Sequence, residues 1–189
     1  MNTPAHLIFG AAAFAKPGHK RVTLAAILGS LAPDISLYLM ASWSIMVSGV
    51  NPQIVFNEYY YSPSWQQVFA VDNSFVLWGL GLGIALWARR PAWIAFAGAG
   101  VLHLAFDFPV HNHDARMHFW PISNWTFISP FSYWDSRFHA GFVSKVEIGL
   151  ALALAVLLLG RFKRLGSRVL IVLVAVAETI ATGAFGAIF

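Results

Sequence analysis

The segment Ala92–Phe108 reads A-W-I-A-F-A-G-A-G-V-L-H-L-A-F-D-F and is followed by Pro109. It is apolar until its last turns, where His103 and Asp107 stand four residues apart. A helix places residues at this spacing on the same face, one above the other. Ionisable groups inside a membrane are costly, and where they occur together they usually mark a functional site. The segment therefore predicts a membrane helix with a working site near its end.

The composition of the chain is that of a membrane protein. Of 189 residues, 58% are hydrophobic and only 11% are charged, and the sixteen Phe and eight Trp suit anchoring at lipid–water interfaces. The absence of cysteine excludes disulfides, thiolate zinc sites, iron–sulfur clusters and cysteine nucleophiles, leaving nitrogen and oxygen as metal ligands. The net charge of +4 does not indicate nucleic-acid binding, because the basic residues form short clusters between apolar runs.

Six apolar segments predict an all-α, polytopic membrane protein with about five to six membrane helices. A span needs about 20 apolar residues, so the first segment is short and either inserts halfway or forms a hairpin with the second. We expect residues 1–189 to form a single integral membrane domain with outer loops at 49–73 and 109–142. The six segments are Pro4–Ala15, Val22–Val47, Ser74–Trp87, Ala92–Phe108, Val143–Leu159 and Val169–Ile188.

The basic residues predict the orientation of these helices. Nine of the twelve Lys and Arg residues lie in alternate connections, which the positive-inside rule assigns to the cytoplasm. His103 and Asp107 then lie at the outer end of one helix, Asp34 about halfway along a second and His6 near the outer start of a third. These four residues would meet the outer loop 109–142, which begins after Pro109 ends its helix.

That outer loop is rich in histidine. Five of the seven histidines of the chain lie between His103 and His139. His111 and His113 are two residues apart and would share a side if their segment is extended. Asp135 and His139 are four residues apart and would share a face if theirs is helical. A single interfacial histidine is ordinarily a hydrogen-bonded surface residue, but the group as a whole predicts a metal site. Its candidate ligands are His6, Asp34, His103, Asp107, His111, His113, His118, Asp135 and His139.

Nitrogen and oxygen ligands without sulfur favour Zn²⁺, with Mn²⁺ or Fe²⁺ as alternatives. One to three ions would polarise a phosphoryl oxygen and activate water. We expect Asp34 to act as the catalytic base or as a bridging ligand, although a carboxylate after Pro33 could also bond backbone groups freed by a helix kink.

Three basic residues of the outer half, Arg116, Arg137 and Lys145, run against the charge bias. They predict a phosphate-binding clamp, or alternatively solvated charges and contacts with lipid headgroups. The aromatic stretch 119–134 beside them is typical of an interfacial belt, or of a flap next to the site. In either case, the site would open at the level of the lipid headgroups.

Three motifs resemble a known family. The opening T-P-A-H-L-I-F-G, the segment G-S-L-A-P-D (Gly29–Asp34) and the later H-L-A-F-D are similar to the inner-membrane, metal-dependent hydrolases of the YdjM type. That family is distantly similar to the zinc-dependent phospholipase C and single-strand nuclease group, in which a helix carries H-x-x-x-D followed by another histidine. His103, Asp107 and His113 match that pattern, and His6 and Asp34 would correspond to the group's early histidine and catalytic aspartate.

The chain also departs from the family pattern. Many relatives carry an H-R-G-x-T-H-S segment after the P-D motif, whereas residues 49–73 contain no histidine. The later H-x-x-x-E pair is replaced at best by Asp135 and His139 in reversed order. One metal position would therefore be lost, or rebuilt from His111 and His118.

The leading hypothesis is an integral protein of a bacterial-type inner membrane with its site on the periplasmic side. It would be a metal-dependent, phosphoesterase-like hydrolase of a lipid or lipid-linked substrate, with no nucleic-acid partner. One alternative is a non-catalytic scaffold, assembly subunit or divalent-metal carrier that uses the same ligands. Another is haem ligation by His6 and His103 from facing helices. The substrate and the oligomeric state stay open.

Overall fold

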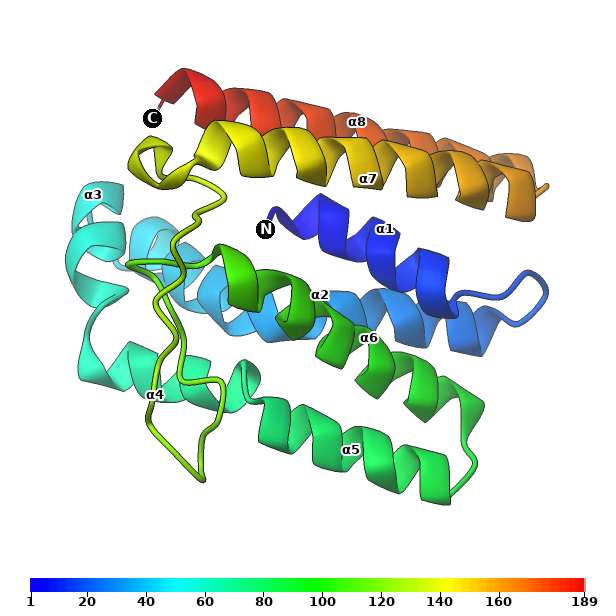
Figure 1. The fold of residues 1–189 in the computed structure, drawn as a ribbon, viewed down its shortest axis with the longest axis horizontal. Coiled ribbons are helices and arrows are strands. Elements are labelled where there is room, and N and C mark those ends of the chain that lie inside the picture. Colours follow the sequence, from blue (N-terminus) through cyan, green and yellow to red (C-terminus); the bar gives the residue numbers. More distant parts are fainter. Residues whose placement is uncertain (189) are drawn as a thin grey trace.

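The computed structural model describes the backbone of residues 1–188 and the side chains of residues 1–183. Within this range the chain consists of helices and loops, with no strand (Figure 1). The α-helices are α1 (Thr3–Phe14), α2 (Lys20–Ser42), α3 (Pro52–Ile54), α4 (Pro63–Asp72), α5 (Phe75–Trp87), α6 (Pro91–Asp107), α7 (Ala140–Arg161) and α8 (Leu165–Ile188). The short π- and 3₁₀-helical segments are η1 (Trp43–Val47), η2 (Val55–Tyr59), η3 (Phe108–Val110) and η4 (Ser136–Phe138).

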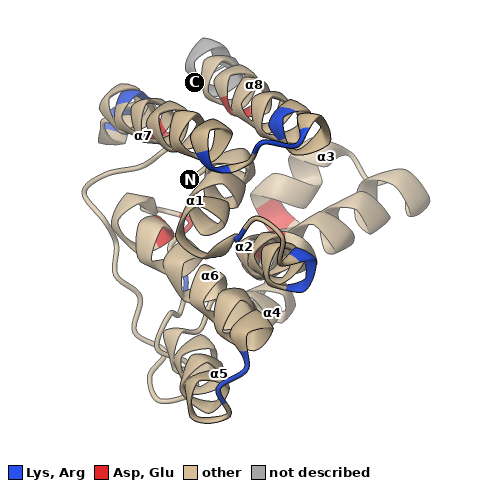
Figure 2. Cartoon of the chain, turned by 90° about the vertical axis from the view of Figure 1, so that its right-hand side faces the viewer, with Lys and Arg blue, Asp and Glu red and all other residues tan. Residues whose placement is uncertain are grey.

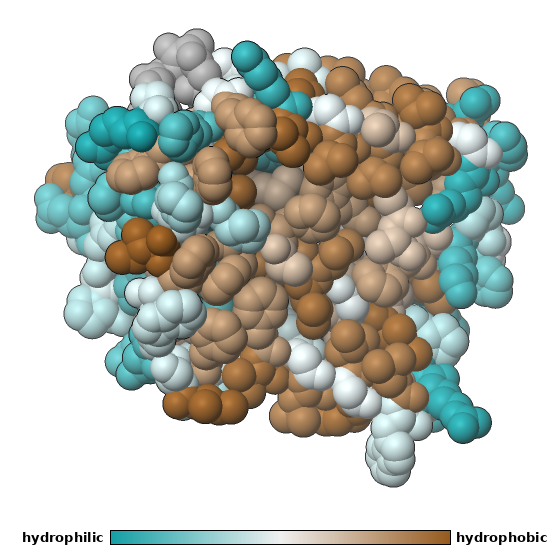
Figure 3. Space-filling model, in the orientation of Figure 1, coloured by the Kyte–Doolittle hydropathy of each residue, from teal (hydrophilic) through white to brown (hydrophobic). Residues whose placement is uncertain are grey.

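Five segments of the described chain are long and apolar enough to cross a membrane, and α1 is a shorter apolar helix. The prediction of an all-α, polytopic membrane protein is therefore confirmed. Large hydrophobic side chains point outward along the helices, and Figure 3 shows an apolar band between two more polar ends. The five segments are Lys20–Val47, Pro63–Trp87, Pro91–Val110, Ala140–Arg161 and Leu165–Gly183.

The region 49–73, expected to be an outer loop, is largely helical. It contains α3, η2 and α4, and α4 continues into α5 after a break at Asn73 and Ser74. The Ser74 side chain accepts the backbone N–H of Leu77 at 3.1 Å and so caps α5. Together α4 and α5 make a 25-residue span. The predicted segment Ser74–Trp87 was too short to cross a membrane by itself, and α4 supplies the missing length. The second long connection is irregular, as expected, from residue 111 to residue 135.

The basic connections gather at one end of the molecule. Figure 1 shows the α1–α2, α5–α6 and α7–α8 turns at the same end, and Figure 2, viewed from that side, shows Lys and Arg at these turns. The long loop 111–135 and α3 lie toward the other end (Figure 1). We call these the basic end and the site end. The alternation of connections predicted from charge is thus present in the fold.

The helices that supply the site pack closely through small residues. A Cβ atom added to Gly29 of α2 would lie 2.0 Å from the carbonyl oxygen of Phe96 in α6, which is a severe overlap. On α1, a Cβ at Gly10 would overlap the Ser30 side chain in the same way. Small residues let membrane helices approach closely enough for their backbones to touch. The contacts of α2 with α1 and α6 bring polar residues of all three helices together.

Candidate metal centre and its cavity

Two imidazoles and a carboxylate form the centre of the site. The rings of His6 (α1) and His103 (α6) are stacked, with centroids 3.6 Å apart and planes 11° apart. The Nε2 atom of His6 lies 3.0 Å from Asp107 Oδ1, and that of His103 lies 3.1 Å from Asp107 Oδ2. All three residues are buried, and each offers a ligand atom within 4.8 Å of the others. His6, His103 and Asp107 therefore form a group that could hold a metal ion.

A hydrogen bond from one ring nitrogen of His103 determines whether the other ring nitrogen carries a proton or a lone pair. Its Nδ1 atom lies 2.7 Å from the backbone carbonyl oxygen of Ser30 and can only donate to it. In the neutral ring Nε2 then carries a lone pair, which faces Asp107 and also Asp34 Oδ1 at 3.6 Å. A lone pair among carboxylate oxygens requires a proton or a metal ion between them. Such an anchoring hydrogen bond is the usual partner of a metal-binding histidine.

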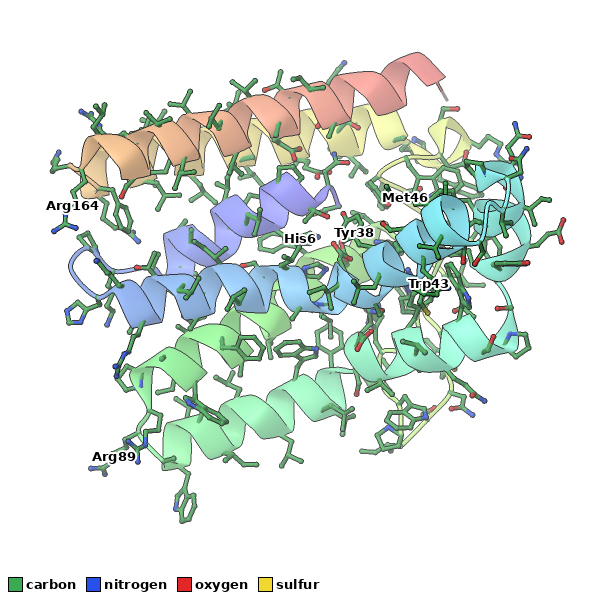
Figure 4. The ribbon with its side chains drawn as sticks, turned by 180° about the vertical axis from the view of Figure 1, so that it is seen from behind. His6, Tyr38, Trp43, Met46, Arg89 and Arg164 are labelled. Atoms are coloured by element: carbon green, nitrogen blue, oxygen red, sulfur yellow. The ribbon has the colours of Figure 1, made fainter. Side chains whose placement is uncertain are left out.

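Asp34 comes from the middle of α2, one residue after Pro33. Its Oδ2 atom accepts a hydrogen bond from the Thr3 hydroxyl at 2.9 Å, and the same hydroxyl contacts the Tyr38 hydroxyl. The remaining oxygen faces His103. Figure 4 shows His6 and Tyr38 in the space where α1 approaches α2. The Asp34 carboxylate is therefore oriented toward His103 of the group of three.

The start of the chain adds further polar contacts. The Met1 amine lies 2.5 Å from Asp107 Oδ1, and the backbone N–H of Asn2 donates to Glu147 Oε1 of α7 at 2.6 Å. Glu178 of α8 accepts from Thr182 at 2.9 Å. Both glutamates are buried, and neither makes a hydrogen bond or ion pair with His6 or His103 in the described chain. Glu147 thus reaches the site only through the first residues of the chain.

His111 links Asp107 to a second carboxylate. Its Nε2 atom is 3.4 Å from Asp107 Oδ1, and its Nδ1 atom is 2.8 Å from Asp114 Oδ2. Burial alone would lower the pKa of His111, but the charges of Asp114 and Asp107 raise it to about 9. Burial would raise the pKa of Asp114, yet His111 and the Trp134 indole N–H, which donates at 3.0 Å, hold it well below its usual value. The two residues form a buried ion pair at the site end.

A cavity of about 540 Å³ opens beside these residues. Asp34, Asp107, His111 and Asp114 line it together with Arg116, and the rest of the wall is largely aromatic. The aromatic residues of the wall are Tyr38, Phe56, Tyr60, Tyr61, Tyr133 and Trp134. The cavity is large enough for a phosphate-bearing headgroup and holds polar groups in an apolar setting, as ligand sites commonly do.

Four candidate ligands lie away from the group. The exposed His113 packs against Phe138, with ring centroids 5.2 Å apart. The Nδ1 atom of His118 lies 2.8 Å from the Asn73 carbonyl oxygen, and burial lowers the pKa of His118 to about 4. Asp135 pairs with Arg137, and His139 is exposed at the start of α7. The structure therefore brings together His6, Asp34, His103, Asp107 and His111 of the nine residues.

The basic residues of the expected clamp are separated as well. Arg116 is buried and lines the cavity. The Arg137 side chain is 72% exposed and bound to Asp135 at 2.6 Å, which lowers the pKa of that carboxyl. Lys145 is exposed on α7. Of the three, only Arg116 is in contact with the cavity.

The stacking of the two rings bears on the haem alternative. A bis-histidine haem holds its axial imidazoles on opposite faces of the porphyrin, so the plane of the macrocycle lies between them. His6 and His103 lie face to face with 3.6 Å between centroids, which leaves no space for a porphyrin. The haem alternative does not fit this arrangement.

Thr3, Ser30, Tyr38 and Asp114 belong to the site but were not among the predicted site residues. Tyr38 follows Asp34 by four residues and so shares its helix face, a signal that was available in the sequence. Thr3 stands in the opening motif T-P-A-H, three residues before His6. The carbonyl of Ser30 has no sequence signal, because any residue could supply it.

Comparisons of the chain with protein-family models, with curated proteins and with solved structures found no match.

Proposed function

We propose that the protein is a membrane-embedded, metal-dependent hydrolase of a phosphoester in a lipid or lipid-linked substrate, similar in kind to the YdjM-type family that its motifs resemble. One observation carries the proposal: two stacked, buried histidines contact Asp107, which lines a cavity together with a second aspartate, Asp34. Buried histidines and carboxylates gathered at a cavity are a recognised signature of a catalytic centre.

The donor set fits a divalent ion. His6, His103 and Asp107 would hold it through two nitrogens and a carboxylate oxygen, a set that suits Zn²⁺ and also Mn²⁺ or Fe²⁺. The inward-facing Nε2 of His103, fixed by the Ser30 carbonyl, is the atom that most requires a cation. A bound ion supplies Lewis acidity, which polarises a phosphoryl oxygen and makes water a better nucleophile.

Asp34 is our candidate for the general base. Its Oδ2 atom is engaged by Thr3, whereas its Oδ1 atom faces His103 at 3.6 Å and the residue lines the cavity. A carboxylate held in this way can accept a proton from an attacking water molecule and keep it beside the reacting groups. Asp107 is shared by His6, His103 and His111, so we assign it to ion binding.

The lipid character of the substrate is inferred from the surroundings of the cavity. Phe56 and Tyr61 line the cavity and are 47% and 46% exposed, so its rim is continuous with an apolar outer surface. On η1, Trp43 and Met46, labelled in Figure 4, are also 64% and 82% exposed. A headgroup could enter the cavity while its chains stayed among these side chains.

Membrane and sidedness are also part of the proposal. We propose an inner membrane of bacterial type, with the basic end in the cytoplasm and the site end facing the periplasm. The support is the positive-inside rule, applied to connections that the fold gathers at one end.

A non-catalytic metal scaffold is the main competitor, and the same centre would serve it. The carrier version fits less well. Between the level of the centre and the basic end, the segments 7–14, 91–102, 148–160 and 75–87 contain no Asp, Glu or His. An ion leaving the centre toward the basic end would meet no ligand along these helices.

The first test is the metal content of detergent-purified protein, measured by inductively coupled plasma mass spectrometry. The wild type, His103→Ala and Asp107→Ala are compared with His113→Ala, a control that removes an exposed histidine outside the centre. We expect bound zinc, manganese or iron in the wild type and the control, and its loss in the other two. Hydrolysis of a lipid phosphoester by the metal-loaded wild type separates the enzyme from the scaffold. A folded wild type without metal would overturn both.

A further inference from the structure

Arg116 is a buried cation that is not paired with any carboxylate of the described chain. It is 7% exposed, and none of the ion pairs formed by the described residues includes it. Its Nη1 atom is fully buried without a hydrogen-bond partner in that part of the chain. The charges of Asp114 and Asp72 act on Arg116 without a direct ion pair. Because a buried cation without a directly bound anion is unfavourable, the position favours an anionic ligand.

Aromatic rings hold the guanidinium in place without using its N–H groups. Its central carbon lies 4.0 Å from the centroid of the Phe69 ring and 4.7 Å from that of Tyr60. Cation–π contacts of this kind engage the face of a guanidinium, whereas its N–H groups point outward in its plane. The rings therefore stabilise and orient Arg116 and leave its hydrogen-bonding edge available.

The carboxylate closest to Arg116 in sequence, Asp114, interacts with it through charge but forms no ion pair with it among the described residues. Asp114 Oδ2 accepts from Trp134 Nε1 at 3.0 Å and lies 2.8 Å from His111 Nδ1. Arg116 nevertheless lines the same cavity as Asp34 and Asp107. An oxyanion in the cavity would thus find one oriented guanidinium on a wall that also includes Asp107 of the candidate metal centre.

We propose that Arg116 is the anion-binding residue of this cavity and that its ligand is a phosphate group. The planar fork of arginine matches the paired oxygens of a phosphate, with short and strong charge-assisted hydrogen bonds. The inference rests on the proposed function for the choice of phosphate over other oxyanions. The group can belong to a lipid headgroup or be free phosphate, such as the product of hydrolysis. In both cases Arg116 is the contact, while Arg137 and Lys145 take no part.

Isothermal titration of the detergent-purified chain tests this assignment with two probes, inorganic phosphate and water-soluble dihexanoyl phosphatidic acid. Arg116→Gln is compared with Arg137→Gln, which removes an exposed arginine of the same loop. We expect Arg116→Gln to weaken binding by about tenfold or more, the effect of losing a charge-assisted hydrogen bond, and Arg137→Gln to leave it unchanged. Binding of the lipid probe alone identifies a headgroup site, and binding of phosphate identifies a site for the free anion.

The proposal is overturned if the folded wild type binds neither probe, or if Arg116→Gln binds them as well as the wild type does. If Arg116→Gln does not fold, Arg116→Lys replaces it, because lysine keeps the charge and loses the planar fork; unaltered affinity in that variant would also overturn the assignment. The wild type provides a measurement that needs no variant, since a bound ligand raises the unfolding temperature. Phosphate should raise it, and chloride at equal ionic strength should not.

A His103→Ala arm, titrated in the presence of a chelator, separates this inference from the metal proposal. Binding that persists there and depends on Arg116 would show an anion site that stands without the metal centre. A wild type that holds metal but shows no Arg116-dependent binding would leave the metal centre standing and remove the anion site.

Discussion

His6 and His103 lie ring on ring, and both direct Nε2 to the carboxylate of Asp107. The two residues are 97 positions apart in the chain and come from separate helices, so the stack is a product of tertiary packing. It also separates two roles of His6 that can be tested apart, because its ring fills space and its nitrogen faces the centre.

His6→Phe preserves an aromatic ring for the stack and removes the nitrogen ligand. We expect a folded protein whose metal affinity is reduced by about 100-fold or more. Even changes to groups that only support a ligand reduce metal affinity by about 10- to 100-fold. Metal-buffer titration followed by elemental analysis gives the affinity. His113→Phe, outside the centre, should keep the wild-type value, and wild-type affinity in His6→Phe would remove His6 from the ligand set.

Asp34→Asn tests the assignment of the base. The amide keeps the size of the side chain and an oxygen for Thr3 but cannot take up a proton. We expect hydrolysis of a lipid phosphoester to fall by about 100-fold or more, with the metal content unchanged. If metal and activity are lost together, Asp34 is a ligand; if activity is unchanged, it has no catalytic role.

Gly29→Ala tests the close approach of α2 to α6. The added methyl group would overlap the Phe96 carbonyl, and such overpacking typically costs about 1–3 kcal/mol. Thermal unfolding in detergent should show the loss. Gly83→Ala in α5 is the matched control, because a Cβ there meets nothing within 4 Å and alanine is the better helix former.

His118 predicts a pH dependence of stability. Its pKa falls from 6.5 to about 4 because the ring is buried, so the folded state favours the neutral form. Above pH 6.5 this residue causes no loss; as the pH drops from 6.5 toward 4, the unfolded chain takes up a proton that the folded chain does not, and stability falls. The unfolding temperature of His118→Gln should therefore decline less than that of the wild type between pH 7 and pH 4.5. Parallel declines would contradict the assignment.

The orientation can be read with a membrane-impermeant maleimide, because the chain has no cysteine of its own. Arg137→Cys places a thiol at the site end, where the side chain is 72% exposed, and Lys163→Cys places one at the basic end. In intact spheroplasts we expect labelling of Arg137→Cys and not of Lys163→Cys. The reverse pattern would put the site in the cytoplasm.

Apolar runs were sufficient to predict α1, α2, α5, α6, α7 and α8, and charge clusters predicted the alternation of their connections. They missed α4, because Gln66 and Gln67 interrupt the apolar pattern there and its helical character depends on continuing into α5. The pairing of His103 with Asp107 followed from helical periodicity alone.

The rest of the site could not be derived in this way. His113, His118 and His139 lie in or next to an irregular loop whose path depends on contacts with α4 and α5, such as the bond from Phe75 N–H to the His118 carbonyl at 2.8 Å. Spacing has no fixed meaning in such a segment, so residues that match a ligand pattern can point elsewhere.

The approach of α2 to α6 at Gly29 has one more consequence. Ser30, whose carbonyl fixes the tautomer of His103, is the next residue along the chain, so a bulkier residue at 29 would also draw that carbonyl away from the imidazole. A change in the packing of α2 against α6 at Gly29 would therefore also change the hydrogen bond between Ser30 and His103. A glycine with no functional group of its own thereby helps to position the candidate metal centre, and sequence drift at this position should be as restricted as at the histidine it serves.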